Sequence, residues 1–228
     1  SQSISENEYG QSSFTTEYPS QEGPSGTTFT FNTTLVNNGA DTQSYSLSAQ
    51  APSGWQVSFK PSGEATQIAA IDIDSAGTQG ISVTVIPPEN VEAGEYKIPI
   101  TAVSSKETMN LDLNVNITGT YGLTVTTPTG LLSLDTSAGK ESAVTLNVMN
   151  TSNVPLENIS LTSSAPAGWT VEFDNSTIES LDAGATKEVV AHITPGEDAM
   201  TGDYVTSISA SVAETSASAE FRVTVKTA

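Results

Sequence analysis

The chain has 228 residues, of which 26 are acidic and 7 are basic, so its formal net charge is −19. This charge argues against a nucleic-acid partner and against electrostatic binding to an anionic membrane, because both need clustered Lys and Arg side chains. Cysteine is absent, which excludes disulfide bonds and thiol chemistry. A composition rich in Thr, Ser, Val and Ile favours strands over helices.

The first predicted strands begin the two halves of the chain. Residues 9–16 match residues 121–127, and a proline, Pro19 or Pro128, follows each of them. A proline so close to a strand favours an edge position, where the missing N–H group costs least. We therefore expect an edge strand and then a turn at the start of each half.

The next pair of predicted strands, residues 27–37 and 141–150, alternates apolar and polar side chains, which is the pattern of a half-buried strand. Both end in Asn-rich turns at residues 37–41 and 150–153. The side chains expected to face the core are Phe29, Phe31, Thr33 and Leu35 in the first half and Val144, Leu146 and Val148 in the second.

A short stretch then occurs twice, as Ala-Pro-Ser-Gly-Trp-Gln-Val-Ser-Phe at residues 51–59 and Ala-Pro-Ala-Gly-Trp-Thr-Val-Glu-Phe at residues 165–173. Pro and Gly mark a turn, and the tryptophan opens a strand of period 2. Side chains at this spacing point to one face, so we expect two sets to enter a core together: Trp55, Val57 and Phe59, and Trp169, Val171 and Phe173.

The halves differ in length after this stretch, because 41 positions separate Trp55 from Tyr96 but only 35 separate Trp169 from Tyr204. Loops absorb insertions at little cost, so the extra residues are expected near residues 60–69. Further alternating strands follow in both halves. Their predicted inward residues are Ile98, Ile100, Ala102, Leu111, Leu113, Val115 and Ile117, and Thr206, Ile208, Ala210, Phe221, Val223 and Val225.

These patterns predict an all-β protein made of two tandem immunoglobulin-like antiparallel β-sandwiches with seven or eight strands each. The predicted domains are residues 1–118 and 119–228, joined end to end by a short linker at residues 118–120 with hinge freedom at Gly119. The sequence begins with Ser1 and contains no signal peptide or long apolar stretch, so it is read as a processed or excised fragment.

Each half carries the same signals in order. These are an Asn-rich turn, the Pro-x-Gly-Trp-x-Val-x-Phe stretch, an Ala-Gly turn (residues 76–77 and 183–184), a Val/Ile strand ending in Pro, and Gly-Glu-Tyr or Gly-Asp-Tyr. This order resembles the NEW-type domain found beside alpha-galactosidase catalytic domains, an immunoglobulin-like or fibronectin-III-like module. The resemblance implies an accessory domain of carbohydrate-active enzymes or of tandem envelope proteins anchored in bacterial and archaeal membranes. It brings no set of binding residues, and a fold alone does not define a function.

The aromatic residues are first interpreted as structural. Trp55 and Trp169 are expected in the core rather than as sugar-binding platforms. Tyr96 and Tyr204 follow Gly-acid turns, as do the corner tyrosines of sandwich folds, whose hydroxyl groups bind the backbone. The aromatic residues left for an exposed sugar-binding surface are Tyr9, Phe14, Tyr18, Tyr45 and Tyr121.

Ionisable groups give weak site signals. His192 is the only histidine and lies opposite in parity to the apolar stripe, so it should face solvent, without a catalytic triad or a zinc site. The acidic groups weighed as calcium ligands are Asp72 and Asp74, Glu89, Glu92 and Glu95, and Glu197, Asp198 and Asp203, with a solvated surface as the simpler interpretation. A Lys–Asn isopeptide bond would use Lys140 or Lys226. Glycosylation sequons begin at Asn32, Asn116, Asn150, Asn158 and Asn175.

The sequence therefore predicts no catalytic, cofactor-binding or metal-binding residues, and a protein that is not an enzyme. We expect an extracytoplasmic spacer and interaction module of a bacterial cell-envelope protein, secreted or anchored at the cell surface. Its partner would be a protein or a glycan at that surface, with no nucleic acid, and a membrane would be reached only through a segment outside these residues. The alternative is a carbohydrate-binding accessory module of the kind attached to glycoside hydrolases.

Overall fold

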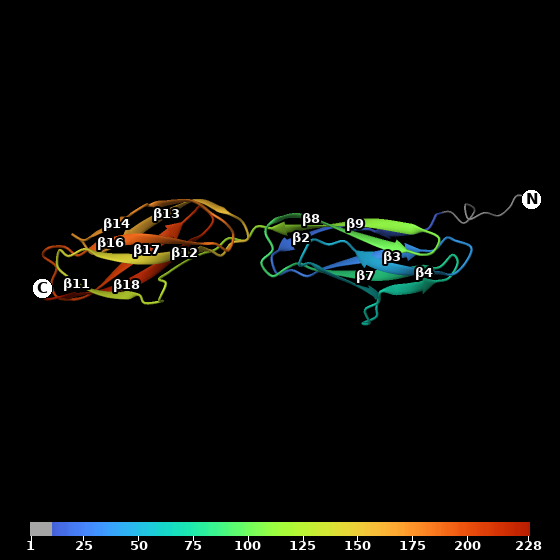
Figure 1. Cartoon of the computed structure of the whole chain (residues 1–228), viewed down its shortest axis with the longest axis horizontal. Coiled ribbons are helices and arrows are strands. Elements are labelled where there is room, and N and C mark those ends of the chain that lie inside the picture. Colours follow the sequence, from blue (N-terminus) through green and yellow to red (C-terminus); the bar gives the residue numbers. More distant parts are fainter. Residues whose placement is uncertain (1–10) are drawn as a thin grey trace, which may run out of the picture. The chain divides into compact units, whose positions relative to one another are not determined.

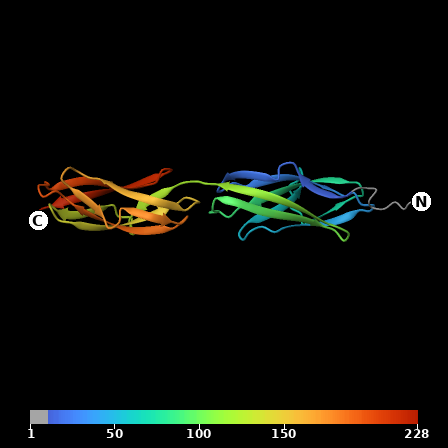
Figure 2. The ribbon, with the colours of Figure 1, turned by 90° about the horizontal axis from the view of Figure 1, so that it is seen from above.

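The structure, a computed structural model, describes residues 11–228, and that part of the chain contains strands but no helix. It accordingly has no helix that could cross a membrane. The chain divides into two compact units, Ser1–Thr118 (unit 1) and Gly119–Ala228 (unit 2). Within each unit the strands form two stacked layers, as Figures 1 and 2 show from two directions. The prediction of an all-β protein with two tandem sandwiches is confirmed.

The strands of unit 1 form a four-stranded sheet in the order β1-β3-β7-β5 and a five-stranded sheet in the order β2-β9-β8-β4-β6. Their bounds are β1 (Ser13–Thr16), β2 (Ser20–Pro24), β3 (Phe29–Val36), β4 (Gln43–Ala49), β5 (Gln56–Pro61), β6 (Ala70–Ile73), β7 (Thr78–Ile86), β8 (Gly94–Val103) and β9 (Thr108–Thr118).

Unit 2 repeats this topology, with one sheet ordered β10-β12-β16-β14 and the other β11-β18-β17-β13-β15. Its strands are β10 (Leu123–Thr126), β11 (Ser133–Ser137), β12 (Ser142–Asn150), β13 (Leu156–Ser164), β14 (Thr170–Phe173), β15 (Thr177–Leu181), β16 (Thr186–Thr194), β17 (Gly202–Ser211) and β18 (Ser216–Lys226).

Each unit thus has nine strands in the described residues, rather than the predicted seven or eight. The additional strand follows the turn after the predicted first strand, as β2 in unit 1 and β11 in unit 2. In unit 1 the chain leaves β1 at the turn that contains Pro19 and crosses to the other sheet. There β2 pairs in parallel with β9, as β11 does with β18, so the sheets are not wholly antiparallel. The sequence signals of residues 20–24 and 133–137 were too short and too polar to predict these edge strands.

The core of each unit lies between its two sheets and is formed by the predicted alternating residues. In unit 1, Phe31, Leu35 and Ile98 are fully buried, and Thr33 is buried with its hydroxyl donating to the Ile81 carbonyl at 2.8 Å. The equivalent stripe of unit 2 buries Leu146 and Val148. Burial of these side chains is the main favourable contribution to folding, at about 25 cal/mol per Å² of apolar surface.

One buried asparagine closes the end of each sandwich. Asn37 has no exposed surface, its side-chain amide donates to the carbonyls of Asp41 and Ile73, and its side-chain oxygen accepts from the Gly39 amide. Asn150 makes the equivalent bonds in unit 2, to Val154, Leu181 and Ser152. Buried polar groups need such partners, so the two predicted Asn-rich turns are held by the side chain that begins them.

The predicted Ala-Gly turns differ in register between the two units. The residue with positive φ is Ala76 (62°) in unit 1 but Gly184 (75°) in unit 2. The Asn37 amide donates to the Gly77 carbonyl, and the equivalent Asn150 amide donates to the Ala185 carbonyl. Gly77 is therefore equivalent to Ala185. The expected alignment of residues 76–77 with residues 183–184 is therefore wrong by one position, because an Ala-Gly pair cannot reveal which member takes the left-handed conformation.

Candidate functional site

The two Pro-x-Gly-Trp stretches form tight turns. Gly54 and Gly168 have φ values of 86° and 84°, which favour glycine, and the amide of each following tryptophan donates to a proline carbonyl at 3.1 Å. Trp55 is 9% exposed and belongs to the core of unit 1. Trp169 is half-buried and packs against the core of unit 2. The structural interpretation of both tryptophans is confirmed, with a more open setting for the second.

The two predicted corner tyrosines are also confirmed. The hydroxyl groups of Tyr96 and Tyr204 each donate to a backbone carbonyl four residues earlier, at Glu92 and Met200, with both distances at 2.7 Å. Burial, with the nearby Glu92 carboxylate as a smaller cause, raises the pKa of the Tyr96 hydroxyl. Each hydroxyl therefore ties its strand to the preceding loop.

Two of the five aromatic residues predicted to be exposed are buried. Phe14 is 5% exposed and lies opposite Leu35 in the core, where its counterpart in unit 2 is Val125. Tyr45 is completely buried, and its hydroxyl donates to the Glu107 carboxylate at 2.5 Å. Burial, and secondarily this bond, raises the pKa of the Tyr45 hydroxyl well above its usual value.

The expectation failed for Tyr45 because a phenol can enter a core once its hydroxyl has a partner. That partner, Glu107, is 62 positions away in the sequence. Of the remaining three residues, Tyr18 and Tyr121 are 68% and 50% exposed, whereas Tyr9 lies outside the described residues.

Tyr18 borders a shallow groove of about 360 Å³ on the outer side of the β1-β3-β7-β5 sheet. Two side chains of this groove are held in place by hydrogen bonds to β3, from Thr16 to the Asn32 carbonyl and from Gln21 to the Thr30 carbonyl, each at 2.7 Å. The groove combines an exposed aromatic ring with hydroxyl and amide groups and the Glu17 carboxylate, which suits a polar ligand without negative charge.

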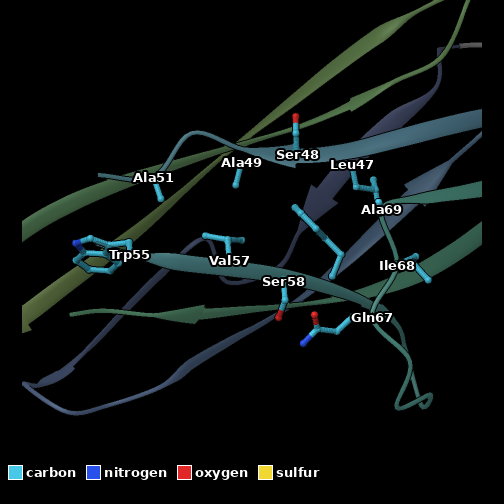
Figure 3. Close-up of a pocket in the computed structure, with 11 residues that line it drawn as sticks. Leu47, Ser48, Ala49, Ala51, Trp55, Val57, Ser58, Gln67, Ile68 and Ala69 are labelled. Carbon is cyan, nitrogen blue, oxygen red and sulfur yellow. The ribbon is translucent and has the colours of Figure 1, made fainter. Parts of the chain in front are cut away.

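A second cavity, the β4–β5 slot, opens between the two sheets of unit 1 and has a volume of about 430 Å³. Leu47, Ala49 and Ala51 line one wall, and Trp55, Val57 and Phe59 line the other. Figure 3 shows Ala49 and Val57 pointing toward each other across the slot, while Ser48 and Ser58 point away from it. The inserted segment 60–69 borders one end through Gln67, Ile68 and Ala69. No sequence signal predicted this slot.

The acidic candidates are dispersed. Within residues 11–228, no three His, Cys, Asp or Glu side chains are grouped so that they could hold a metal ion. Asp72 is exposed on β6, and Asp74 accepts a hydrogen bond from Thr42 at 3.2 Å. The carboxylates of the acidic loops weighed as calcium ligands are exposed, for example at Glu89 and Asp198.

His192 faces outward on β16, as predicted, and is bonded to two carboxylates. Its Nε2 lies 2.6 Å from Asp174 and its Nδ1 lies 3.2 Å from Glu141. The hydrogen bond to Asp174 is the main cause that raises the pKa of His192, and Glu141 adds to it. This arrangement ties the segments around β12, β14 and β16 together at the surface.

The structure limits which lysines could form an isopeptide bond and which sequons could carry a glycan. Lys226 forms an exposed ion pair with Asp135 at 2.8 Å, and Lys140 is exposed, so neither amine has the buried setting that an isopeptide bond requires. Asn150 is fully buried with its amide bonded, so this sequon cannot carry a glycan in the folded unit. Asn32, Asn158 and Asn175 are exposed.

The fold defines a protein of two immunoglobulin-like sandwiches in tandem. The model of the NPCBM-associated NEW3 domain of alpha-galactosidase matches residues 24–105 and again residues 136–213, so the chain belongs to this family. The expected resemblance is thereby confirmed, once in each unit. No curated protein matches the chain.

Solved structures with a similar fold are remote in sequence. A family 123 glycoside hydrolase from Clostridium perfringens has 11% identity and a TM-score of 0.38, over 51% of this chain and 25% of that chain. A protein of unknown function from Porphyromonas gingivalis has 12% identity and a TM-score of 0.33, over 94% and 99%. Domains 4 and 5 of the S-layer protein SbsC have 13% identity and a TM-score of 0.35, over 75% and 70%. Likenesses this distant carry no functional argument.

Proposed function

We propose that this chain is a non-catalytic, extracytoplasmic module that acts as a spacer and as an interaction surface in a bacterial cell-envelope protein. The observation that carries the proposal is the repeated match to a domain family named for its association with alpha-galactosidase. The chain has two copies of the domain, each with its own buried core. Two folded domains give a spacer its length and offer a partner more surface than one. The net charge of −19 favours solubility and mutual repulsion on a crowded surface.

The absence of cysteine allows a direct test of the spacer role. Spin labels attached through Glu64→Cys in unit 1 and Glu214→Cys in unit 2, both at exposed positions, would report the distance between the units. A spacer predicts one narrow distance distribution by double electron–electron resonance. A distribution as broad as that of a flexible linker of the same length would contradict it.

Location and lack of catalysis need separate measurements. Protease treatment of intact cells of the source organism should remove the module from the full-length protein if it lies outside the cytoplasm. Protection until lysis would contradict that location. A panel of chromogenic glycosides and esters should give no turnover above a heat-denatured control, and enzyme-dependent hydrolysis of any of them would overturn the non-catalytic assignment.

A carbohydrate-binding accessory module is the second candidate, favoured by the exposed ring of Tyr18 beside a groove of hydroxyl and amide groups. Pyranose rings bind through stacking on such rings and through hydrogen bonds to such groups. A glycan-array screen, with calcium and without it, tests this candidate. Tyr18→Ala should abolish any selective signal, whereas Tyr121→Ala, at an exposed tyrosine of unit 2, should leave it unchanged. A blank array with folded protein would reject this candidate.

A further inference from the structure

We propose that the β4–β5 slot of unit 1 binds an extended, cationic segment of a partner protein by strand addition. This inference rests on the proposed interaction function and assigns it to a site. The slot is defined by Leu47, Ala49 and Ala51 on the β4 side and by Trp55, Val57 and Phe59 on the β5 side.

The backbone edges that face the slot follow from the hydrogen-bond alternation of antiparallel strands. The Gln50 amide donates to the Pro99 carbonyl, so the even-numbered residues at this end of β4 form the hydrogen bonds to β8. The amide and carbonyl of Ala49 therefore point away from β8. On the opposite wall, Ser62 donates to Gly80 of β7, so the amide and carbonyl of Val57 likewise point away from β7. Because β6 begins only at Ala70 and pairs with the first part of β4, these edges face the slot.

The chain itself provides an example of such binding. At the end of the slot, the inserted segment passes between the two walls, from a bridge at Ile68 to a bend at Ala69 that leads into β6. The Ile68 amide donates to the Phe59 carbonyl of β5 at 2.8 Å, and the next residue, Ala69, accepts from the Leu47 amide of β4 at 2.8 Å. One stretch of backbone therefore fits between these edges and bonds both of them. The open part of the slot offers the same two edges farther along, at Ala49 and Val57.

The buried side chains of the β5 wall form the floor of the slot and determine which side chains the partner must carry. Trp55 and Phe59 are buried core residues that reach the slot, and Ile68 packs beside them from the inserted segment. The small side chains of Ala49 and Ala51 leave room above this floor. An incoming strand that continues the arrangement of Ile68 would place an aliphatic side chain on the floor at every second position.

The charge of unit 1 determines the flanks of the partner segment. Residues 1–118 contain three lysines, Lys60, Lys97 and Lys106, against thirteen acidic residues. A field of this sign attracts basic segments and raises their association rate, and it repels acidic ones. The partner is thus an extended segment with alternating aliphatic residues and Lys or Arg at its ends, bound as in other cases of strand addition.

Unit 2 provides the matched control. The segment between β14 and β15 is much shorter there, residues 174–176, and has no counterpart of the inserted residues. The equivalent of Ala49 is Ser163, because Leu47 pairs with Ala102 as Leu161 pairs with Ala210. Ser163 is exposed, and Phe173, the equivalent of Phe59, is only partly buried. A substitution at Ser163 thus tests the equivalent surface without the inserted segment.

The test selects peptides from a phage-displayed library of random twelve-residue sequences on the whole chain. The expected result is enrichment of peptides with alternating aliphatic residues and basic ends, which bind as synthetic peptides with micromolar affinity. Ala49→Trp should fill the slot and weaken binding at least tenfold. Ala49→Pro removes one slot-facing amide without touching the bonds to β8, and should also weaken binding at least tenfold. Ser163→Trp should change it less than twofold.

Circular dichroism on each variant checks that the fold is retained. If no peptides are enriched, or if enriched peptides bind the Ala49 variants as well as the parent, the slot is not the binding site. In the second case the interaction function itself still stands at another surface, so the two failures are distinguishable. Enriched peptides that are acidic would also overturn the proposal.

Discussion

The indole ring of Trp55 lies against the phenol ring of Tyr96, with ring centroids 4.7 Å apart and planes inclined by 42°. Trp169 and Tyr204 repeat the contact at 5.0 Å and 51°. In unit 1 the tryptophan precedes β5 of one sheet and the tyrosine lies in β8 of the other. Each aromatic pair therefore joins the two layers of its sandwich at one end, and the tyrosine hydroxyl binds the adjoining loop.

Removal of this hydroxyl should destabilise unit 1 modestly. Tyr96→Phe keeps the ring contact but loses the bond to the Glu92 carbonyl, which costs about 1 kcal/mol. Tyr96→Ala loses the ring as well and should cost about 3 kcal/mol. Urea unfolding followed by tryptophan fluorescence measures both, and Trp169→Phe in the background leaves Trp55 as the single reporter. Equal losses for the two variants would mean that the ring contact contributes nothing.

The sequence was sufficient for the layers and for these aromatic pairs because both depend on local patterns. The alternation of apolar and polar residues predicted which side chains face the core, and the Gly-Glu-Tyr sequence predicted the corner tyrosine Tyr96. Features that depend on distant partners were not predictable. The burial of Tyr45 requires Glu107, which comes from a loop 62 positions later, and the β4–β5 slot requires an insertion whose path the sequence does not specify. The parallel pairing of β2 with β9 likewise joins opposite ends of unit 1.

Exchange of the left-handed residue in the turn before β7 should stabilise unit 1. Ala76 has a φ of 62°, a conformation that costs a non-glycine residue about 1–2 kcal/mol. Ala76→Gly relieves this cost but increases the entropy of the unfolded chain, which offsets about 0.4–1 kcal/mol. The expected net gain is about 0.5–1 kcal/mol in the free energy of unfolding. Gly184→Ala, the mirror experiment in unit 2, should destabilise, and a stabilising effect there would refute the assigned register.

A hydroxyl in the core of unit 2 should be replaceable with a gain in stability. Thr206 is fully buried, and its hydroxyl has no hydrogen-bond partner among residues 11–228. The equivalent residue of unit 1 is Ile98, since Tyr96 and Tyr204 pair with Val115 and Val223 at the same register. An unpaired buried polar group costs about 1–3 kcal/mol, so Thr206→Val should raise the stability of unit 2 by about 1 kcal/mol. A loss of stability would indicate that a water molecule bonds this hydroxyl.

The buried asparagines should be among the most sensitive positions. Asn150→Ala leaves the carbonyls of Val154 and Leu181 and the amide of Ser152 without this partner, which should cost roughly 3 kcal/mol. For a domain of this size that corresponds to a fall in Tm of roughly 15 °C, measurable by calorimetry. Ser163→Ala, at an exposed position of the same unit, is the control and should lower Tm far less. Comparable effects of the two substitutions would show that Asn150 does not hold the turn.

The pKa of His192 should lie above 6.5 in the folded protein, and Asp174 should be the main cause. A raised pKa means that the folded state binds the proton more tightly than the unfolded state does. The resulting stabilisation is fully present below pH 6.5 and is lost as the pH rises through the folded-state pKa. Asp174→Asn should lower the pKa measured by NMR titration of the imidazole ring more than Glu141→Gln does, because Asp174 is the closer carboxylate. A pKa that neither substitution changes would mean that the two hydrogen bonds do not persist in solution.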